Sequence, residues 1–145
     1  DYLGMLEEDV DGGVSCGDAT CEDQLTVEII RADNDSFMPG DYWFAVGLPD
    51  GSIYSVSCYL IHPDSGFECE LGDVDVMYPY ANVGATVIYL VLNGAPESLV
   101  AAVEYNGYLL GERTIVPAYQ DVYPDGDTSC PSCLVADESM AVASW

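Results

Sequence analysis

The sequence predicts an all-β protein, built as an antiparallel β-sandwich that is stapled by disulfide bonds. Three observations support this fold class. Many short runs alternate apolar and polar residues, Gly, Pro, Asn and Asp separate these runs, and no segment repeats with the 3.6-residue period of a helix. The chain has 145 residues, half of them hydrophobic, which is enough for one domain with a substantial core.

A hairpin with a tight turn at residues 62–65 organises the prediction. Folding the chain at this turn places Leu60 opposite Phe67 and Cys58 opposite Cys69 on two antiparallel strands. Both cysteines lie on the apolar face of their strands, close enough to bridge. We therefore expect a Cys58–Cys69 disulfide.

The other strands follow from the same alternation. Residues 85–92 are apolar on both faces, which indicates a central strand. Asn106-Gly107 is typical of a type I′ hairpin turn. Pro79 should end one strand, whereas residues 115–119 should extend another past Pro117 along a sheet edge. The expected strands are residues 24–31, 41–46, 54–60, 67–71, 74–78, 85–92, 99–105, 108–114 and 134–142.

Six cysteines, an even number, favour an oxidising compartment, so we expect an extracellular or cell-surface location. Proximity in the sequence suggests that Cys130 pairs with Cys133 and Cys16 with Cys21. A crossed pairing of Cys16 and Cys21 with Cys130 and Cys133 is the main alternative. Zinc binding and redox catalysis by the C-x-x-C sequence are less favoured, because a second C-x-x-C is missing and the surroundings are acidic.

The charge of the chain is extreme. Twenty-six acidic residues face two basic ones, Arg31 and Arg113, giving a net charge of −24. Such a charge makes nucleic acid and anionic membrane surfaces poor partners. Adaptation to a salty medium explains it, and so does binding of divalent cations.

Calcium is the cofactor that the sequence favours, because it takes oxygen ligands from carboxylates and loop carbonyls. Two short acidic loops supply candidate ligands: Asp33 and Asp35 in one, Asp125 and Asp127 in the other. Neither loop matches the twelve-residue calcium-binding loop, and ordinary Asx turns are the favoured explanation of both.

Residues 1–23 form an acidic arm, and residues 24–145 the sandwich domain. The arm carries Tyr2, Leu3, Met5 and Leu6, apolar side chains that a merely solvated tail does not need. We expect them to dock on another copy of the protein, or alternatively on their own domain. Because the sequence starts at Asp1, we expect a processed, mature chain, and residues 85–92 are too short a run for membrane insertion.

The C-terminal region resembles a group of uncharacterised secreted, often lipid-anchored bacterial proteins of the myxobacterial type. Their shared pattern is P-x-Y, then P-[ND]-G, then C-x-x-C before a last strand, and the likeness extends loosely over residues 16–142. The matching residues here are Pro117, Tyr119, Pro124, Asp125, Gly126, Cys130 and Cys133. The resemblance implies an immunoglobulin-like sandwich at a cell surface and no known activity. Because an anchor needs an N-terminal cysteine, we do not expect the family's lipid anchoring here.

Catalysis has little support in the sequence. His62 is the only histidine and falls in a turn, and no nucleophile elbow, phosphate-binding loop or dinucleotide fingerprint occurs. We therefore expect a non-enzymatic structural subunit of an extracellular filament or surface layer, a homo-oligomer or polymer. The alternative is a monomeric surface module that binds glycan or protein through an exposed row of its aromatic residues.

Overall fold

The computed structural model describes residues 21–64, 66–73, 75–123 and 132–143. Within these residues the chain is all-β. Its strands are β1 (Gln24–Arg31), β2 (Gly40–Gly47), β3 (Ile53–Leu60), β4 (Phe67–Gly72), β5 (Met77–Ala81), β6 (Val87–Asn93), β7 (Leu99–Tyr105), β8 (Tyr108–Ile115), β9 (Gln120–Val122) and β10 (Cys133–Val142).

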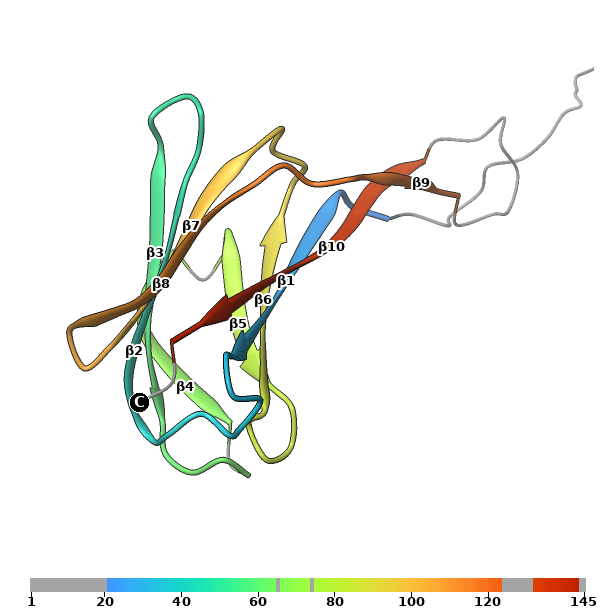
Figure 1. Cartoon of the computed structure of the whole chain (residues 1–145). Coiled ribbons are helices and arrows are strands. Elements are labelled where there is room, and N and C mark those ends of the chain that lie inside the picture. Colours follow the sequence, from blue (N-terminus) through green and yellow to red (C-terminus); the bar gives the residue numbers. More distant parts are fainter. Residues whose placement is uncertain (1–20, 65, 74, 124–131, 144–145) are drawn as a thin grey trace, which may run out of the picture.

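The strands form two five-stranded sheets that face each other (Figure 1). The first sheet has the order β5-β6-β1-β10-β9, and the second has the order β4-β3-β2-β7-β8. Alternate residues of both sheets point into one shared core, among them Val27 and Leu90 from the first sheet and Phe44 and Val103 from the second. The predicted sandwich of mostly antiparallel sheets is therefore confirmed.

The hairpins match the sequence predictions closely. Cys58 pairs with Cys69 and Leu60 with Phe67 across β3 and β4, as expected. Asn106 and Gly107 connect β7 to β8 with positive φ angles of 49° and 88°, as a type I′ turn requires.

One pair of strands contradicts the prediction of purely antiparallel sheets. β1 and β10 pair in parallel, from Gln24 with Val135 to Arg31 with Val142. Parallel neighbours need a long connection, and here almost the whole domain lies between the two strands. The first sheet therefore joins the two ends of the domain side by side.

The predicted strand limits are wrong at β5 and β8, and the strand expected to start at residue 74 begins at Met77. Pro79 does not end a strand: it is buried within β5 and pairs with Leu90. The first sheet tolerates it because β5 is an edge strand with no further neighbour to receive an N–H. β8 ends at Ile115 instead of extending to residue 119, and the chain then crosses to the other sheet to form β9.

Both basic side chains are used by the fold. Arg31 is buried at the end of β1, where it donates to the backbone oxygen of Ser36 and forms an ion pair with Asp33 at 2.7 Å. Arg113 on β8 donates to the backbone oxygen of Ser139 on β10 and so ties one sheet to the other. These are the only two basic residues of the whole sequence.

Candidate functional site

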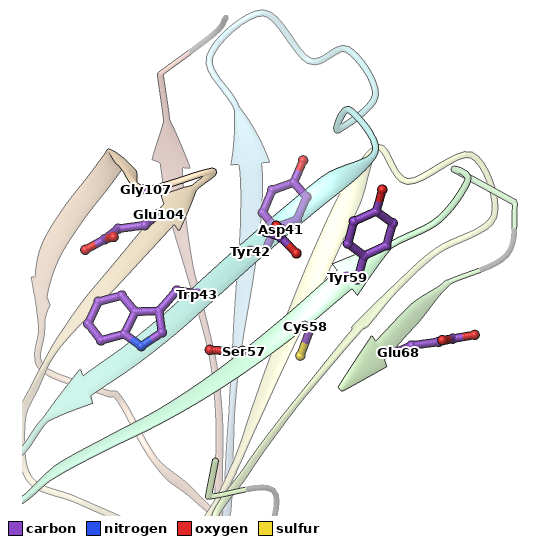
Figure 2. A pocket seen from close by; sticks show the side chains of 9 residues that line it. All are labelled: Asp41, Tyr42, Trp43, Ser57, Cys58, Tyr59, Glu68, Glu104 and Gly107. Carbon is purple, nitrogen blue, oxygen red and sulfur yellow. The ribbon is translucent and has the colours of Figure 1, made fainter. Parts of the chain in front are cut away.

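A groove with a volume of about 630 Å³ lies on the outer face of the second sheet. It crosses β4, β3, β2 and β7 near the β7–β8 turn (Figure 2). We call it the Trp43 groove. Its lining residues are Asp41, Tyr42, Trp43, Ser57, Cys58, Tyr59, Glu68, Glu104 and Gly107.

Strand register arranges the outward side chains of this groove in two rows. In the first row, Trp43 lies between Ser57 on β3 and Glu104 on β7. In the second row, Tyr59 lies between Asp41 on β2 and Glu68 on β4. Each aromatic side chain is thus flanked on one or both sides by a carboxylate, and Figure 2 shows the Glu104 side chain beside the Trp43 indole.

The floor of the groove is a packed aromatic cluster. The ring of Tyr42 points to the inner side of the sheet, where it packs edge-on against Phe67 at a centroid distance of 5.5 Å. It also stacks on Phe44 at 6.2 Å and contacts Tyr105 at 4.9 Å. The Tyr42 hydroxyl donates to the backbone oxygen of Met38 at 2.6 Å, and burial raises its pKa well above the usual value.

Two further links hold the rim. The Cys58–Cys69 disulfide joins β3 to β4, with 4.0 Å between the Cα atoms, next to Tyr59 and Glu68. At the other side, the Asp41 N–H donates to the Asn106 side-chain oxygen at 3.0 Å, and the Asn106 N–H donates to the Asp41 backbone oxygen at 2.8 Å. The two rows therefore sit on a rigid support.

The polar character of the groove is dominated by hydrogen-bond acceptors. In the part of the chain that the structure describes, the carboxylates of Asp41, Glu68 and Glu104 have no hydrogen-bond or ion-pair partner. They also do not converge on one point, because the described residues contain no group of three or more His, Cys, Asp and Glu side chains that could hold a metal ion. The groove thus offers separate negative charges beside ring faces.

The first predicted calcium loop is organised around an arginine. Asp33 forms the ion pair with buried Arg31, and its other carboxylate oxygen accepts the Asp35 N–H at 3.1 Å. The bond from Asp33 to the N–H two residues on is that of an ordinary Asx turn, and the Asp35 carboxylate accepts the N–H of Ser36 at 2.8 Å. Asp125 and Asp127 of the second loop lie outside the described residues.

His62 lies in the turn between β3 and β4, and its Nδ1 accepts the Asp64 N–H at 3.1 Å. Its side chain is 62% exposed.

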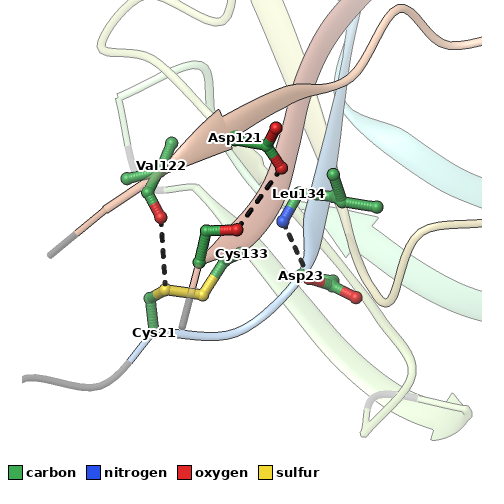
Figure 3. The surroundings of a disulfide bond; sticks show 7 residues. Cys21, Asp23, Asp121, Val122, Cys133 and Leu134 are labelled. Atoms are coloured by element: carbon green, nitrogen blue, oxygen red, sulfur yellow. Dashed lines mark hydrogen bonds between the residues drawn. A yellow bond between two sulfur atoms is a disulfide. The ribbon is translucent and has the colours of Figure 1, made fainter. Parts of the chain in front are cut away.

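A disulfide joins Cys21 to Cys133, with 5.9 Å between the Cα atoms (Figure 3). The predicted local pairs, Cys16 with Cys21 and Cys130 with Cys133, are therefore wrong. Cys21 and Cys133 meet because they lie three and two residues before Gln24 and Val135, the first pair of the parallel ladder of β1 and β10. The bridge follows the crossed alternative, while Cys16 and Cys130 themselves lie outside the described residues.

Hydrogen bonds reinforce this junction of the two chain ends. The Asp23 carboxylate accepts the N–H of Leu134 at 2.8 Å, and the Asp23 backbone oxygen accepts the N–H of Gly94 at 2.8 Å. β1 is thus fixed to β10 on one side and to the end of β6 on the other.

A second aromatic surface lies on the outer face of the first sheet. Tyr80 on β5 stacks on Tyr89 of β6 with a centroid distance of 5.0 Å, and Tyr78 lies 6.2 Å from Tyr80. Tyr78 and Tyr80 are 56% and 42% exposed. Half-buried Val91 lies opposite Tyr78. We call the surface formed by Tyr78, Tyr80, Tyr89 and Val91 the tyrosine face.

The sequence predicted an exposed aromatic row without locating it. The signal was present in the run Asp41-Tyr42-Trp43-Phe44, since alternation sends Trp43 and Asp41 to the face opposite Tyr42 and Phe44. Alternation does not predict which residues of the neighbouring strands lie beside Trp43 and Asp41. The arm residues predicted to mediate assembly, Tyr2, Leu3, Met5 and Leu6, lie outside the described residues.

Comparison with protein-family models, with curated proteins and with solved structures found no match to this chain. Among the described residues, no helix has the length and apolar character needed to cross a membrane.

Proposed function

We propose that this protein is a non-enzymatic, extracellular binding module, with an immunoglobulin-like sandwich that presents the Trp43 groove to a glycan or protein. The observation behind the proposal is the groove itself: exposed ring surface and unpaired carboxylates gathered on a rigid sheet. Binding sites commonly combine a hollow, aromatic walls and a few polar groups in this way.

The disulfides support the proposed extracellular location. Two bridges, Cys58–Cys69 and Cys21–Cys133, are present in the described residues. Disulfides persist in oxidising environments, and this supports placing the protein outside the cytosol.

The proposal assigns binding instead of chemistry to the groove. Its described lining residues include no histidine, and its cysteine, Cys58, is bonded to Cys69. The carboxylates are supplied by separate strands and flank aromatic rings, an arrangement suited to contacts with a ligand surface.

Tryptophan fluorescence tests the proposal. In a Trp145→Phe background, Trp43 is the only tryptophan of the chain, so its emission reports on the groove. We expect a saturable change on titration with a member of a panel of oligosaccharides and peptides. We also expect loss of that ligand's binding to Trp43→Ala, measured by titration calorimetry because this variant retains no tryptophan emission. Tyr78→Ala, on the opposite sheet, is the matched control and should bind normally. The proposal fails if no panel member changes the emission, or if both variants bind equally.

A structural subunit of an extracellular assembly is the second candidate, and the tyrosine face favours it. Exposed tyrosines next to half-buried valines are typical of surfaces that pack against another protein. The apolar residues of the arm, Tyr2, Leu3, Met5 and Leu6, would add a second contact between copies.

Sedimentation analysis separates the two candidates. An assembling protein should form dimers or larger species that are lost in Tyr80→Glu or on deletion of residues 1–15, while each variant stays folded. A full-length protein that is monomeric at every tested concentration and salt condition rules out the assembly function.

A further inference from the structure

We propose that the ligand of the Trp43 groove is a basic segment of another protein, bound in extended conformation with arginine or lysine side chains at alternate positions. This inference rests on the proposed binding function and specifies its ligand class. It is argued below from the donors and acceptors of the groove, from its rings, from the charge of the whole chain and from the spacing of the two rows.

The polar groups of the groove call for donors from the ligand. Ionised carboxylates accept hydrogen bonds and cannot donate them, and Asp41, Glu68 and Glu104 supply three of them. A sugar presents hydroxyl groups that need both donors and acceptors, whereas ammonium and guanidinium groups only donate. The acceptor-rich lining therefore matches a cationic ligand better than a glycan.

The aromatic rings favour the same ligand. Arginine and lysine are attracted to the faces of tryptophan and tyrosine rings, most strongly to tryptophan. Trp43 has Glu104 directly opposite on the neighbouring strand, and Tyr59 has both Asp41 and Glu68. Each row can thus hold one cation by a ring face and a carboxylate together.

The charge of the chain indicates that the ligand belongs to a different protein. Its only arginine or lysine residues, Arg31 and Arg113, both donate to backbone oxygens of their own fold. Another copy has no lysine or further arginine to offer, and the net charge of −24 makes copies repel at low salt. The same charge steers a basic partner toward this molecule.

The spacing of the rows defines the pattern of the ligand. Asp41 and Trp43 are two residues apart on β2, so the rows lie about 7 Å apart along the strand direction. An extended peptide places side chains on the same side every second residue, with the same rise. Two cations at positions i and i+2 therefore fit the two rows, while cations at adjacent positions point to opposite sides.

Peptide titrations in the Trp145→Phe protein test this inference. The probes are two capped pentapeptides of identical composition, Gly-Arg-Gly-Arg-Gly and Gly-Arg-Arg-Gly-Gly, together with a version of the first in which citrulline replaces arginine. Citrulline keeps the shape of arginine and lacks its charge. At fixed ionic strength we expect the alternating peptide to bind about threefold or more tightly than the adjacent one, and the citrulline peptide to show no saturable binding.

Charge-matched variants separate the groove from diffuse attraction. Glu104→Gln and Glu28→Gln change the net charge equally, but Glu28 lies on β1 of the other sheet. We expect Glu104→Gln to weaken the alternating peptide about threefold and Glu28→Gln to leave it nearly unchanged. Thermal melts confirm that both variants are folded.

Several results would overturn the inference. Equal binding of the two arginine peptides, or equal effects of the two variants, shows general electrostatic attraction. Equal binding of spermine and the alternating peptide identifies a small polyamine as the ligand class. Binding of a neutral oligosaccharide but of no arginine peptide supports the binding function and rejects the basic peptide as its ligand. If no probe changes the Trp43 emission, both the binding function and the ligand class are rejected.

Discussion

The Cys21–Cys133 disulfide is expected to stabilise the fold more than the Cys58–Cys69 disulfide. The first bridge spans a sequence separation of 112 and the second a separation of 11. In the chain-entropy treatment, a cross-link stabilises by restricting the unfolded chain, and the effect grows with the logarithm of the loop length. For these two loops it gives about 5 kcal/mol and about 3 kcal/mol of unfolding free energy.

The test is urea unfolding of three proteins in one background. Cys16→Ala and Cys130→Ala define the background, so that only the two described bridges remain. Cys21→Ala/Cys133→Ala is then compared with Cys58→Ala/Cys69→Ala. The comparison is matched because each pair has one buried cysteine, Cys133 and Cys58, each 4% exposed.

We expect the long-loop variant to lose about 2 kcal/mol more than the short-loop variant. This loss should appear as a lower urea midpoint and as a lower free energy of unfolding extrapolated to water. Equal losses, or a larger loss for Cys58→Ala/Cys69→Ala, would refute the argument that loop closure governs these bridges.

Three further predictions concern stability. Gly72→Ala should cost about 2 kcal/mol or more in urea unfolding, because φ is +118° and a Cβ would lie 2.8 Å from the Val56 Cα and against the Ser55 oxygen. A smaller loss than for Gly84→Ala, where φ is also positive but an added Cβ meets no atom within 4 Å, contradicts this. Burial, with nearby Asp23 and Glu138, raises the pKa of Tyr119 to about 12 from 10.0. Between pH 10 and pH 12 the folded state therefore keeps a proton on Tyr119 that the unfolded state loses. The contribution of Tyr119 to the free energy of unfolding is thus fully present below pH 10 and is lost as the pH rises toward 12. In melts at different pH values, Tyr119→Phe should lose less stability over this alkaline range than the unchanged protein. The melting temperature should rise between about 0.1 M and 1 M NaCl, where the screening length falls from about 10 Å to about 3 Å and weakens the repulsion within a chain of charge −24; a melting temperature independent of salt speaks against that repulsion.

The hairpins show how far local patterns reach. The β3–β4 register follows from two alternating runs and one short turn, and the β7–β8 hairpin follows from Asn106-Gly107. The β7–β8 turn has two residues and the β3–β4 connection has six, and in both cases the pattern of each strand and the length of the connection fix the pairing together.

Local patterns fail where the partner is distant. Pro79 was expected to end a strand, and only the position of β5 at a sheet edge explains why the strand continues through it. Residues 116–119 look like a continuation of β8, yet the chain changes sheet there because β9 pairs with β10.

The Trp43 groove combines both kinds of information. Alternation along β2 determines that Trp43 and Asp41 share the outer face, since successive side chains of a strand point to opposite sides. The choice of Ser57, Glu104, Tyr59 and Glu68 as their neighbours depends on which strands lie on either side of β2 and in what register.

By itself, then, the sequence determined the all-β class, the Cys58–Cys69 bridge, the short hairpins and the strongly acidic charge, because composition and periods of two residues are local properties. Only the tertiary structure decided that β1 and β10 are parallel neighbours and that Cys21 bonds to Cys133 instead of a nearer cysteine. The physical reason is that pairing across more than a hundred residues is selected by burial of the whole core, in which Ile29 and Met140 pack together with residues of the other sheet. No short segment of the chain contains that information.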